Sequence, residues 1–539
     1  MINRPMDTVE LLLNRVAASL PESRAALRRL KIAVAAETRS DLIRNDALLS
    51  RYRREVAEGL RHADTRLERI LTLNRIRSES GIATVTVITE PFACPGRCVY
   101  CPTEERAPKS YLTNEPAVMR ALRSEYDPFL QVHRRLAALD ETGHPTDKVE
   151  LIVKGGTWSF YPEAYQQWFL QRCLEAATAF PSGAGRAIET VREAVSDASF
   201  ARAEAANEAA SSRVIGTTIE TRPDYITEEE VRRLRQLGVT RVELGVQTLE
   251  EPVLELIARD HGTAQVRAAT QLLKDAGCKV AYHLMPNLPG ATPESDLDTM
   301  RCLFADAGYQ PDTLKIYPCV VVASAELFRW WRDGRYQPYD DGTLTQLLVR
   351  MKQLVPPHVR IERIIRDIPS TSIEAGCLTT NLREAVQERL RAEGGRCRCL
   401  RCRQVRDDAG GAFTLVRRSY DASSGTELFL SFEDEGRDRL ASFLRLRMPS
   451  AAPAAFPALC GAALVRELHT YGPHLPLSAR QDGAAQHRGF GARLLQEAER
   501  IAREEFRLAR IAVIAGVGAR PYYRRLGYAL HDTYMVKAL

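Results

Sequence analysis

The sequence predicts an α/β protein in which a parallel α/β barrel, or part of one, precedes a smaller mixed α/β domain. From about residue 81 to residue 375, short apolar runs alternate with amphipathic helical segments, which is the pattern of repeated strand–helix units. A second series of strands begins at about residue 412. Residues 376–411 are rich in Cys, Arg and Gly and are interpreted as a linker between the two domains.

Length and composition limit the class of protein. The chain has 539 residues, 45% of them hydrophobic and 27% charged, and a net charge of +6. At roughly 100–200 residues per domain this length predicts about three or four domains. The composition excludes wholesale disorder, and no apolar run is long enough for a spanning helix. Since the N-terminus lacks a signal-peptide core, we expect a soluble, cytoplasmic protein.

The first 80 residues are predicted to be helical and basic. Apolar residues from Leu11 to Leu20 follow helical spacing. Arginines then recur every few residues, at Arg51, Arg53, Arg54, Arg61, Arg66, Arg69, Arg75 and Arg77. They form either a solvated helix face or a binding surface for a phosphate backbone.

Six apolar runs are predicted to be the parallel strands of the barrel: 83–89, 149–157, 214–223, 241–247, 279–286 and 313–318. Amphipathic segments between them, such as 228–238 and 264–277, are predicted helices. The Ala- and Glu-rich stretch 181–212 is expected to be a helical insertion without chemistry of its own.

Three cysteines follow the first predicted strand with the spacing Cys94-x3-Cys98-x2-Cys101. Three thiolates from one loop bind three irons of a 4Fe-4S cluster and leave the fourth iron open. The alternative is a zinc loop that needs a distant fourth ligand. The spacing resembles the radical S-adenosylmethionine superfamily. This resemblance implies a partial TIM-type barrel, S-adenosyl-L-methionine as cofactor and a 5′-deoxyadenosyl radical made by one-electron reduction.

The ends of the predicted strands carry candidates for binding S-adenosylmethionine, because barrel enzymes place their chemistry at the carboxyl ends of strands. Gly155 and Gly156 follow one strand and allow close approach of the ligand to the backbone. Glu220 and Gln247 close two more strands and are candidate hydrogen-bonding partners for its ribose or carboxylate.

A second constellation is the glycine-rich turn Gln486-His487-Arg488-Gly489-Phe490-Gly491-Ala492, which precedes a strongly periodic helix. Free N–H groups at a helix start suit a pyrophosphate. The turn resembles the coenzyme A loop of GCN5-related N-acetyltransferases, and such a domain is expected at 412–539. Tyr522 and Tyr523 are candidates to contact the thioester or protonate a leaving thiolate. The alternative is that they pack the last strand.

A third constellation, Cys397-x-Cys399-x2-Cys402, suits a structural zinc ion in the linker. Its fourth ligand is left open between Cys319 and Cys377. Reactive thiols next to arginines are the alternative interpretation.

Local phrases across residues 70–539 resemble one family. They include DKVELIVKGGT, TIETRPDYIT, MPNLPG, LKIYP, CRCLRCR, QHRGFG and ARPYYRRLGY. The family is that of Elongator protein three, in its free-standing prokaryotic form, whose members are tRNA uridine(34) acetyltransferases. The resemblance implies that the deoxyadenosyl radical removes hydrogen from the methyl group of acetyl-CoA. The resulting carbon radical adds to carbon 5 of the wobble uridine, and thioester hydrolysis releases coenzyme A, giving a carboxymethyl group.

The resemblance also implies roles for individual residues and partners. Cys94, Cys98 and Cys101 would bind the cluster, and Lys315 and Tyr317 would lie beside the target base. Contacts to acetyl-CoA would come from Lys148, Glu467, Leu468, His469, Thr470, Phe490, Gly491, Ala492 and Tyr523. Partners would be the anticodon loop of tRNA and an electron donor such as a flavodoxin or ferredoxin, and a homodimer is left open. The sequence departs from the family at CPTE after the cluster loop, at Lys154 and at Trp158.

Two other hypotheses remain at this point. The chain is alternatively a protein-lysine acetyltransferase with a structural iron–sulfur cluster, which needs a general base near Glu467 or His469. It is alternatively a tRNA-binding scaffold with inert sites, which predicts salt-sensitive tRNA binding without turnover.

Overall fold

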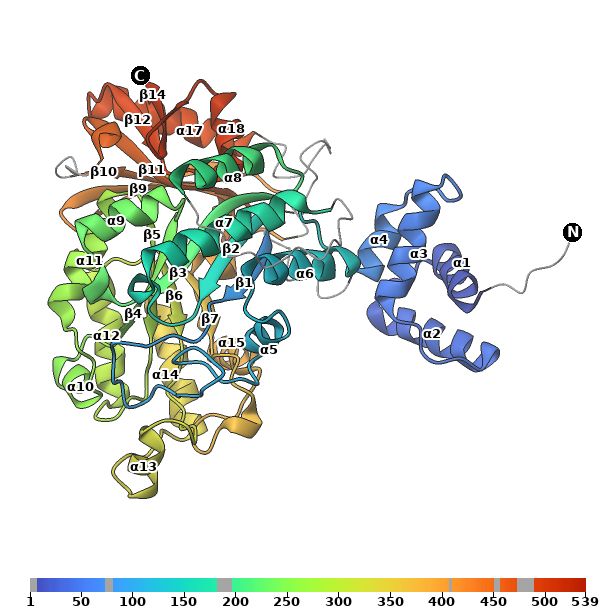
Figure 1. Cartoon of the computed structure of the whole chain (residues 1–539), viewed down its shortest axis with the longest axis horizontal. Coiled ribbons are helices and arrows are strands. Elements are labelled where there is room, and N and C mark those ends of the chain that lie inside the picture. Colours follow the sequence, from blue (N-terminus) through green and yellow to red (C-terminus); the bar gives the residue numbers. More distant parts are fainter. Residues whose placement is uncertain (1–6, 73–80, 182–195, 407–409, 450–455, 473–488) are drawn as a thin grey trace, which may run out of the picture.

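The computed structural model describes residues 7–72, 81–181, 196–406, 410–449, 456–472 and 489–539. Figure 1 shows three parts along the chain: a helical N-terminal bundle that projects from one side, a central barrel, and a C-terminal sheet at one end of the barrel. No helix among the described residues is long and apolar enough to cross a membrane.

The N-terminal bundle is helical, as predicted. Its helices are α1 (Thr8–Ser19), α2 (Arg24–Thr38), α3 (Asn45–Ala57) and α4 (Thr65–Leu71). Three of them begin at side chains that accept a hydrogen bond from a first-turn N–H, namely Asp7, Ser23 and Asp64. Leucines from α1, α3 and α4 share one small apolar core. Arg53 of α3 joins the bundle to the barrel through Asp140, at 3.0 Å.

Seven parallel strands form an open barrel in chain order. They are β1 (Ala83–Ile88), β2 (Lys148–Lys154), β3 (Arg213–Thr221), β4 (Arg241–Gln247), β5 (Lys279–Leu284), β6 (Thr313–Ile316) and β7 (Arg360–Ile364). The six predicted strands are confirmed. The sequence pattern missed β7, Arg-Ile-Glu-Arg-Ile, because polar residues interrupt its apolar run.

Helices between and after these strands complete the barrel layer, since parallel neighbours need crossover connections. They are α5 (Pro116–Leu122), α6 (Pro128–Glu141), α7 (Glu163–Ala179), α8 (Asp197–Ala209), α9 (Glu228–Gln236), α10 (Glu251–Leu256), α11 (Thr263–Asp275), α12 (Pro293–Ala305), α13 (Leu327–Arg332), α14 (Asp341–Leu354), α15 (Leu382–Ala392) and α16 (Leu400–Arg403). The predicted insertion contributes α8, and its residues 182–195 lie outside the described residues.

The C-terminal sheet has seven strands in the order β13-β14-β12-β11-β10-β9-β8. The strands are β8 (Thr414–Ala422), β9 (Gly425–Asp434), β10 (Arg439–Met448), β11 (Ala462–Thr470), β12 (Arg510–Val513), β13 (Ala529–His531) and β14 (Tyr534–Ala538). Only β11 and β12 are parallel neighbours in it. The helices α17 (Phe490–Arg500) and α18 (Arg520–Arg524) complete this part.

Strand β11 carries a β-bulge. Val465 lies opposite Leu446 of β10 and Glu467 lies opposite Arg445, so Arg466 is an extra residue in the ladder. Arg466 extends toward the barrel, where it binds Asp312 at 2.5 Å. Beyond Val465, β11 no longer pairs with β12 and has β10 as its strand neighbour.

The sheet closes the end of the barrel at which the strands begin. Arg466 also binds Glu427 of β9 at 2.9 Å, so one buried guanidinium joins carboxylates from both parts. Gly516 lies so close to the carbonyl oxygen of Ile215 in β3 that an added Cβ would be 2.1 Å from it. Breaking one member of a buried ion pair typically costs about 3–5 kcal/mol, so the two parts are held in a fixed relation.

Candidate functional site

One cavity of about 810 Å³ connects the two ends of the barrel. At the carboxyl ends of the strands it is lined by the predicted cluster loop, and at the other end by the C-terminal sheet. Its lining includes Cys94, Cys98, Cys101, Gly156, Glu220 and Gln247 at the first end, Lys154, His283, Lys315 and Tyr317 in the middle, and Phe443, Arg445, Glu467, His469 and Tyr471 at the second end.

The cluster loop brings its three thiols to one wall of this cavity. Cys98 and Cys101 are in contact, and Sγ of Cys94 lies 4.0 Å from Oγ1 of Thr157. Arg259 donates from Nη1 to Sγ of Cys98 at 3.4 Å. The Cys101 thiol and the Arg259 guanidinium lower the pKa of Cys98 to about 5, which favours the thiolate that iron requires. The donor set therefore fits a cluster.

The predicted contacts to S-adenosylmethionine lie together at the same end. Gly156 has φ +92°, and Gly155 has φ +149° with no room for a side chain, since an added Cβ would be 1.7 Å from Oγ1 of Thr89. Gln247 closes β4 with its Oε1 buried, and no partner within the described part of the chain binds that atom. An orphaned acceptor on the wall of a cavity is expected to bind a ligand.

Buried charges join two of the predicted residues, Glu220 and Lys315, through Lys154 and through Glu243, to which the sequence analysis gave no role in the site. Lys154 binds Glu220 at 2.7 Å and also binds Glu243, and Lys315 binds Glu243 at 2.5 Å. Burial would raise the pKa of Glu220, but Lys154 lowers it to about 2. The sequence feature that could have predicted these buried ion pairs is a charged residue within or at the end of each apolar strand run that contributes to them.

Lys315 and Tyr317, predicted beside the target base, both line the cavity. Burial lowers the pKa of Lys315 to about 8, although Glu243 opposes the change. The ring of Tyr317 lies edge-on to that of His283, with 5.4 Å between centroids.

The predicted contacts on β11 divide between the two faces of the strand. Glu467 and His469 line the cavity, whereas Leu468 packs in the apolar core beneath α17. Thr470 binds Ser442 and lies beside the start of α17. Burial lowers the pKa of His469 to about 3, so the ring is neutral at pH 7, and no described residue binds its Nε2.

The start of α17 forms a second, smaller group with the other face of β11. Gly489 has φ +69° and precedes the helix. An added Cβ at Gly491 would lie 3.5 Å from the hydroxyl of Tyr522 and 3.6 Å from Oγ1 of Thr470. Ala492 is half-buried beside it. Gln486 lies outside the described residues.

Three other predicted contacts are placed differently: Phe490 and Tyr523 adjoin this group with their rings in the core, and Lys148 lies on a barrel strand. Phe490 is buried against Phe432, with 4.5 Å between ring centroids, and Tyr523 packs in the core beside Tyr528. Lys148 is the first residue of β2 and does not appear in the described lining of the cavity. Its charge acts on His469. The roles predicted for these residues stay predictions.

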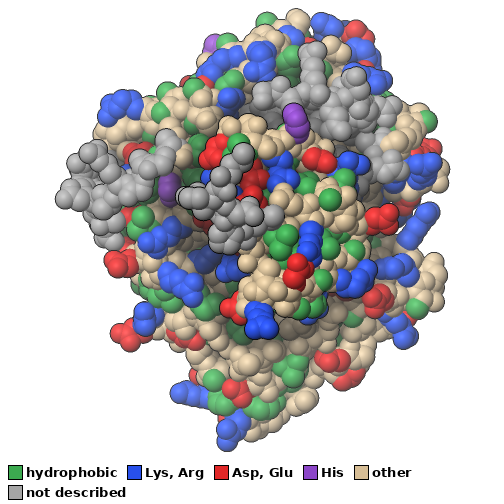
Figure 2. Space-filling view, turned by 90° about the vertical axis from the view of Figure 1, so that its right-hand side faces the viewer, with side chains coloured by type: hydrophobic (Ala, Val, Ile, Leu, Met, Phe, Trp, Pro, Cys, Tyr) green, Lys and Arg blue, Asp and Glu red, His purple; other side chains and the backbone are tan. Residues whose placement is uncertain are grey.

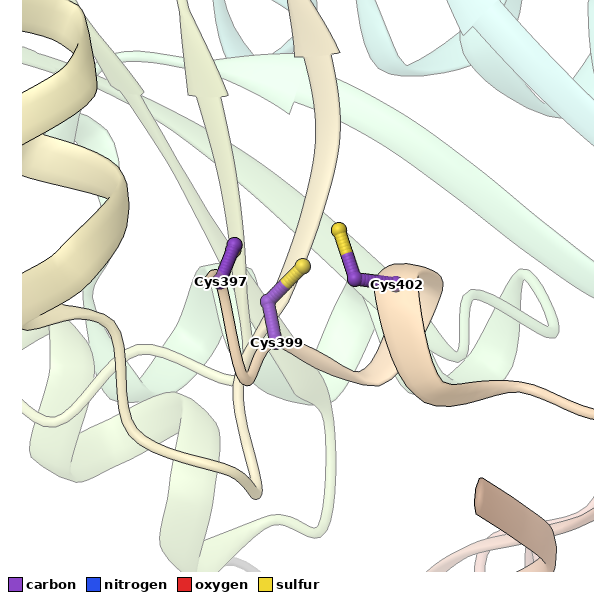
Figure 3. A group of neighbouring side chains, drawn as sticks. All are labelled: Cys397, Cys399 and Cys402. Atoms are coloured by element: carbon purple, nitrogen blue, oxygen red, sulfur yellow. The ribbon is translucent and has the colours of Figure 1, made fainter. Parts of the chain in front are cut away.

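The second cysteine triad converges. Figure 3 shows Cys397 and Cys399 on the chain that leads into the short helix carrying Cys402. Their sulfurs all lie within 4.8 Å of one another, and the Cys399 pKa lies well below its usual value because the other two thiols donate to it. The geometry suits one metal ion. Among the described residues no fourth Cys, His, Asp or Glu joins the group, so neither Cys319 nor Cys377 completes it.

Most arginines predicted to contact phosphate already have partners within the protein. Arg51 binds Glu55 at 2.6 Å, and Arg53 binds Glu68 at 3.0 Å. Arg54 is exposed, whereas Arg75 and Arg77 lie outside the described residues. Figure 2 shows basic and acidic side chains interspersed on this side of the molecule rather than one continuous basic surface.

Comparison with known proteins identifies relatives along most of the chain. Residues 91–303 match the model of the Radical SAM superfamily, and residues 311–392 match that of the Radical_SAM C-terminal domain. A tRNA uridine(34) acetyltransferase of Dehalococcoides mccartyi is 46% identical over 86% of this chain and 99% of its own length. Human Elongator complex protein 3 is 40% identical over 86% and 85%. The structure of archaeal Methanocaldococcus infernus Elp3, 39% identical, superposes with a TM-score of 0.72 over 85% of this chain and 100% of its own.

Proposed function

We propose, because the chain belongs to the family of tRNA uridine(34) acetyltransferases and Elongator complex protein 3, that it uses acetyl-CoA to build a carboxymethyl group on carbon 5 of the wobble uridine of tRNA. The observation that carries this proposal is the single cavity between the cluster loop and the C-terminal sheet. Oε1 of Gln247 at one end and Nε2 of His469 at the other are buried and have no hydrogen-bond partner among the described residues, so both can bind a ligand. Two reactants held at opposite ends can therefore meet inside the barrel.

The cluster end of the cavity is suited to S-adenosylmethionine. When bound, the cluster and this cofactor supply a carbon-centred radical. Cys94, Cys98 and Cys101 would hold the cluster, and the backbone at Gly156 admits the cofactor close to the wall. The side-chain amide of Gln247 would form a hydrogen bond with S-adenosylmethionine. The C-terminal domain is proposed to be an acetyltransferase of the GCN5-related type.

The C-terminal sheet is suited to the acetyl-CoA thioester. After Val465, β11 no longer pairs with β12, so its edge, free among the described residues, can form backbone hydrogen bonds with the amide groups of a ligand. The start of α17 offers N–H groups, and α18 offers the Tyr522 hydroxyl beside them. His469 is neutral at pH 7 because burial lowers its pKa to about 3, and a ring nitrogen of the neutral imidazole can orient the water for thioester hydrolysis by accepting a hydrogen bond from it. Lys279 and Arg445 keep Glu467 ionised beside it, although burial opposes this, with a pKa of about 2.

Reconstitution without oxygen tests the function directly. The full chain, loaded with iron and sulfide, is incubated with tRNA, acetyl-CoA, S-adenosylmethionine and a reductant, and the nucleosides are analysed by mass spectrometry. We expect 5-carboxymethyluridine only when all components are present. Acetylation of a lysine peptide in place of tRNA, with no modified nucleoside, would contradict the proposal and favour the protein acetyltransferase.

The N-terminal bundle is proposed to contact tRNA through α2. Arg24, Arg28 and Arg29 of this helix are exposed. Replacing all three with Ala should weaken tRNA binding and reduce the slope of log K against log salt by about 2. Arg51→Ala should change the slope little because Arg51 is engaged by Glu55. Equal slopes for the triple variant and the unmodified protein would exclude α2 as the contact.

A further inference from the structure

A buried carboxylate lies behind the middle of the cavity wall. Glu243 of β4 is 0% exposed and is not among the described lining residues, although its partners are. Its oxygens accept hydrogen bonds from Lys154 of β2, Lys315 of β6, Arg241 of β4 and His283 of β5. One carboxylate thus gathers donors from four strands.

Each charge around Glu243 has a partner. Three cations, Lys154, Lys315 and Arg241, form ion pairs with four carboxylates, Glu150, Glu220, Glu243 and Glu362. Buried charges are tolerated when each has a partner. Ligand atoms of Glu220, Glu243 and His283 lie within 4.8 Å of one another, but the Lys154 ammonium already bridges both glutamates. We therefore assign no metal ion to them.

We propose that Glu243 is a positioning residue that holds the ammonium groups of Lys154 and Lys315 in the cavity wall, so that together they bind a carbonyl oxygen of the substrate. The proposal rests on the proposed function, which brings an acetyl group and a uracil ring, both with carbonyl oxygens, into this cavity. Donors fixed in advance stabilise charge on such an oxygen without reorganising during the reaction. Glu243 acts from outside the cavity and through the two lysines.

The protonation of Lys315 reports on this arrangement. The charged and titratable groups that face it are Glu243 and Arg241 of β4, Lys154 of β2, Glu362 of β7 and His283 of β5. Burial lowers the pKa of Lys315 to about 8, with Glu243 as the main opposing charge. Removing that charge lowers the pKa further. If Lys315 must be protonated to bind a carbonyl oxygen, a variant without the Glu243 charge should lose activity on raising the pH at a lower value than the unmodified protein does.

The test compares Glu243→Gln and Glu243→Asp with a matched control. In Glu243→Gln the fall of the tRNA modification rate at high pH should begin about one pH unit lower than in the unmodified protein. At a pH on this descending limb of the profile the rate should be about tenfold lower. Glu243→Asp should restore the limb while lowering the maximal rate. Glu427→Gln is the control because Glu427 is equally buried, but its partners Arg447 and Arg466 do not belong to the described cavity lining, whereas Lys154 and Lys315 do. Its limb should stay in place.

A second measurement needs no turnover. Reductive methylation of Lys315 across a pH series, followed by peptide mass spectrometry, gives its protonation midpoint in the resting protein. The midpoint should fall in Glu243→Gln and not in Glu427→Gln. An unchanged midpoint and limb in Glu243→Gln, or equal shifts in the control, would overturn the proposal.

If Glu243→Gln does not fold, Glu243→Asp decides, and an unaltered maximal rate in that variant overturns the proposal. If the unmodified protein leaves tRNA unchanged, the proposed function is wrong. The pH midpoint of Lys315 methylation in Glu243→Gln then shows by itself whether Glu243 holds Lys315.

Discussion

The two cysteine triads have nearly the same spacing and different geometries. Cys397, Cys399 and Cys402 converge within 4.8 Å, as ligands of one ion do. Cys94, Cys98 and Cys101 form no such group among the described residues and line one wall of a cavity instead. The triad of Cys397, Cys399 and Cys402 borders a helix and has two buried thiols and one exposed thiol. The triad of Cys94, Cys98 and Cys101 faces the cavity in which we propose that the reactants meet.

The difference teaches that thiol spacing alone does not determine the metal. The cluster loop is a connection between a barrel strand and its helix, so its thiols take their positions around the end of the barrel. The linker triad is closed by α16, whose first turn returns Cys402 to Cys399 with a backbone hydrogen bond of 3.0 Å. Surroundings, rather than residue count, separate the two triads.

The largest expected effect follows from removing one cluster ligand. Cys98→Ala should abolish iron binding and lower tRNA modification by more than about 1,000-fold, because Cys98 is the thiol that Arg259 and Cys101 stabilise as thiolate. Zinc content should stay at the level of the unmodified protein. Iron and zinc are measured together by elemental analysis, and loss of both metals would refute two independent centres.

The converse variant, Cys399→Ser, should lose zinc and keep iron. Cys399 is fully buried between the other two thiols, so its loss should lower the free energy of unfolding by about 4 kcal/mol. Thermal unfolding and the visible absorption of the reconstituted cluster are the measurements. A Cys399→Ser protein with unaltered melting would mean that the linker triad does not support the fold.

A smaller effect is expected beside the linker triad. Lys352 of α14 is 0% exposed, and its charge favours the Cys402 thiolate. Its ammonium also donates to Gln387 at 2.5 Å. Lys352→Met should weaken zinc binding about tenfold, and Lys352→Arg should weaken it less. Competition with a chelator measures the affinity, and equal affinities in both variants would assign Lys352 to packing alone.

The sequence predicted features that depend on local pattern. Alternating strand and helix runs predicted six barrel strands, and both triads could be recognised from their spacing. Contacts that join distant strands could not be predicted in this way. Lys154 and Glu243 lie within apolar runs, and only the curvature of the barrel brings their side chains together from β2 and β4. Arg51 and Arg53 were likewise paired by the folding of the helical bundle.

The extra residue in β11 has a consequence for which residues meet the substrate. Up to Val465, alternate side chains of the strand face α17 and the barrel in turn. Arg466 and Glu467 then both face the barrel. After them odd-numbered residues face the barrel and even-numbered residues face α17, the reverse of the order before the bulge. The same residues in a regular strand, with Arg466 paired in the ladder, would turn Glu467 and His469 toward the helix and Leu468 toward the barrel. The bulge at one position thus decides which side chains this strand offers to each of its two neighbours.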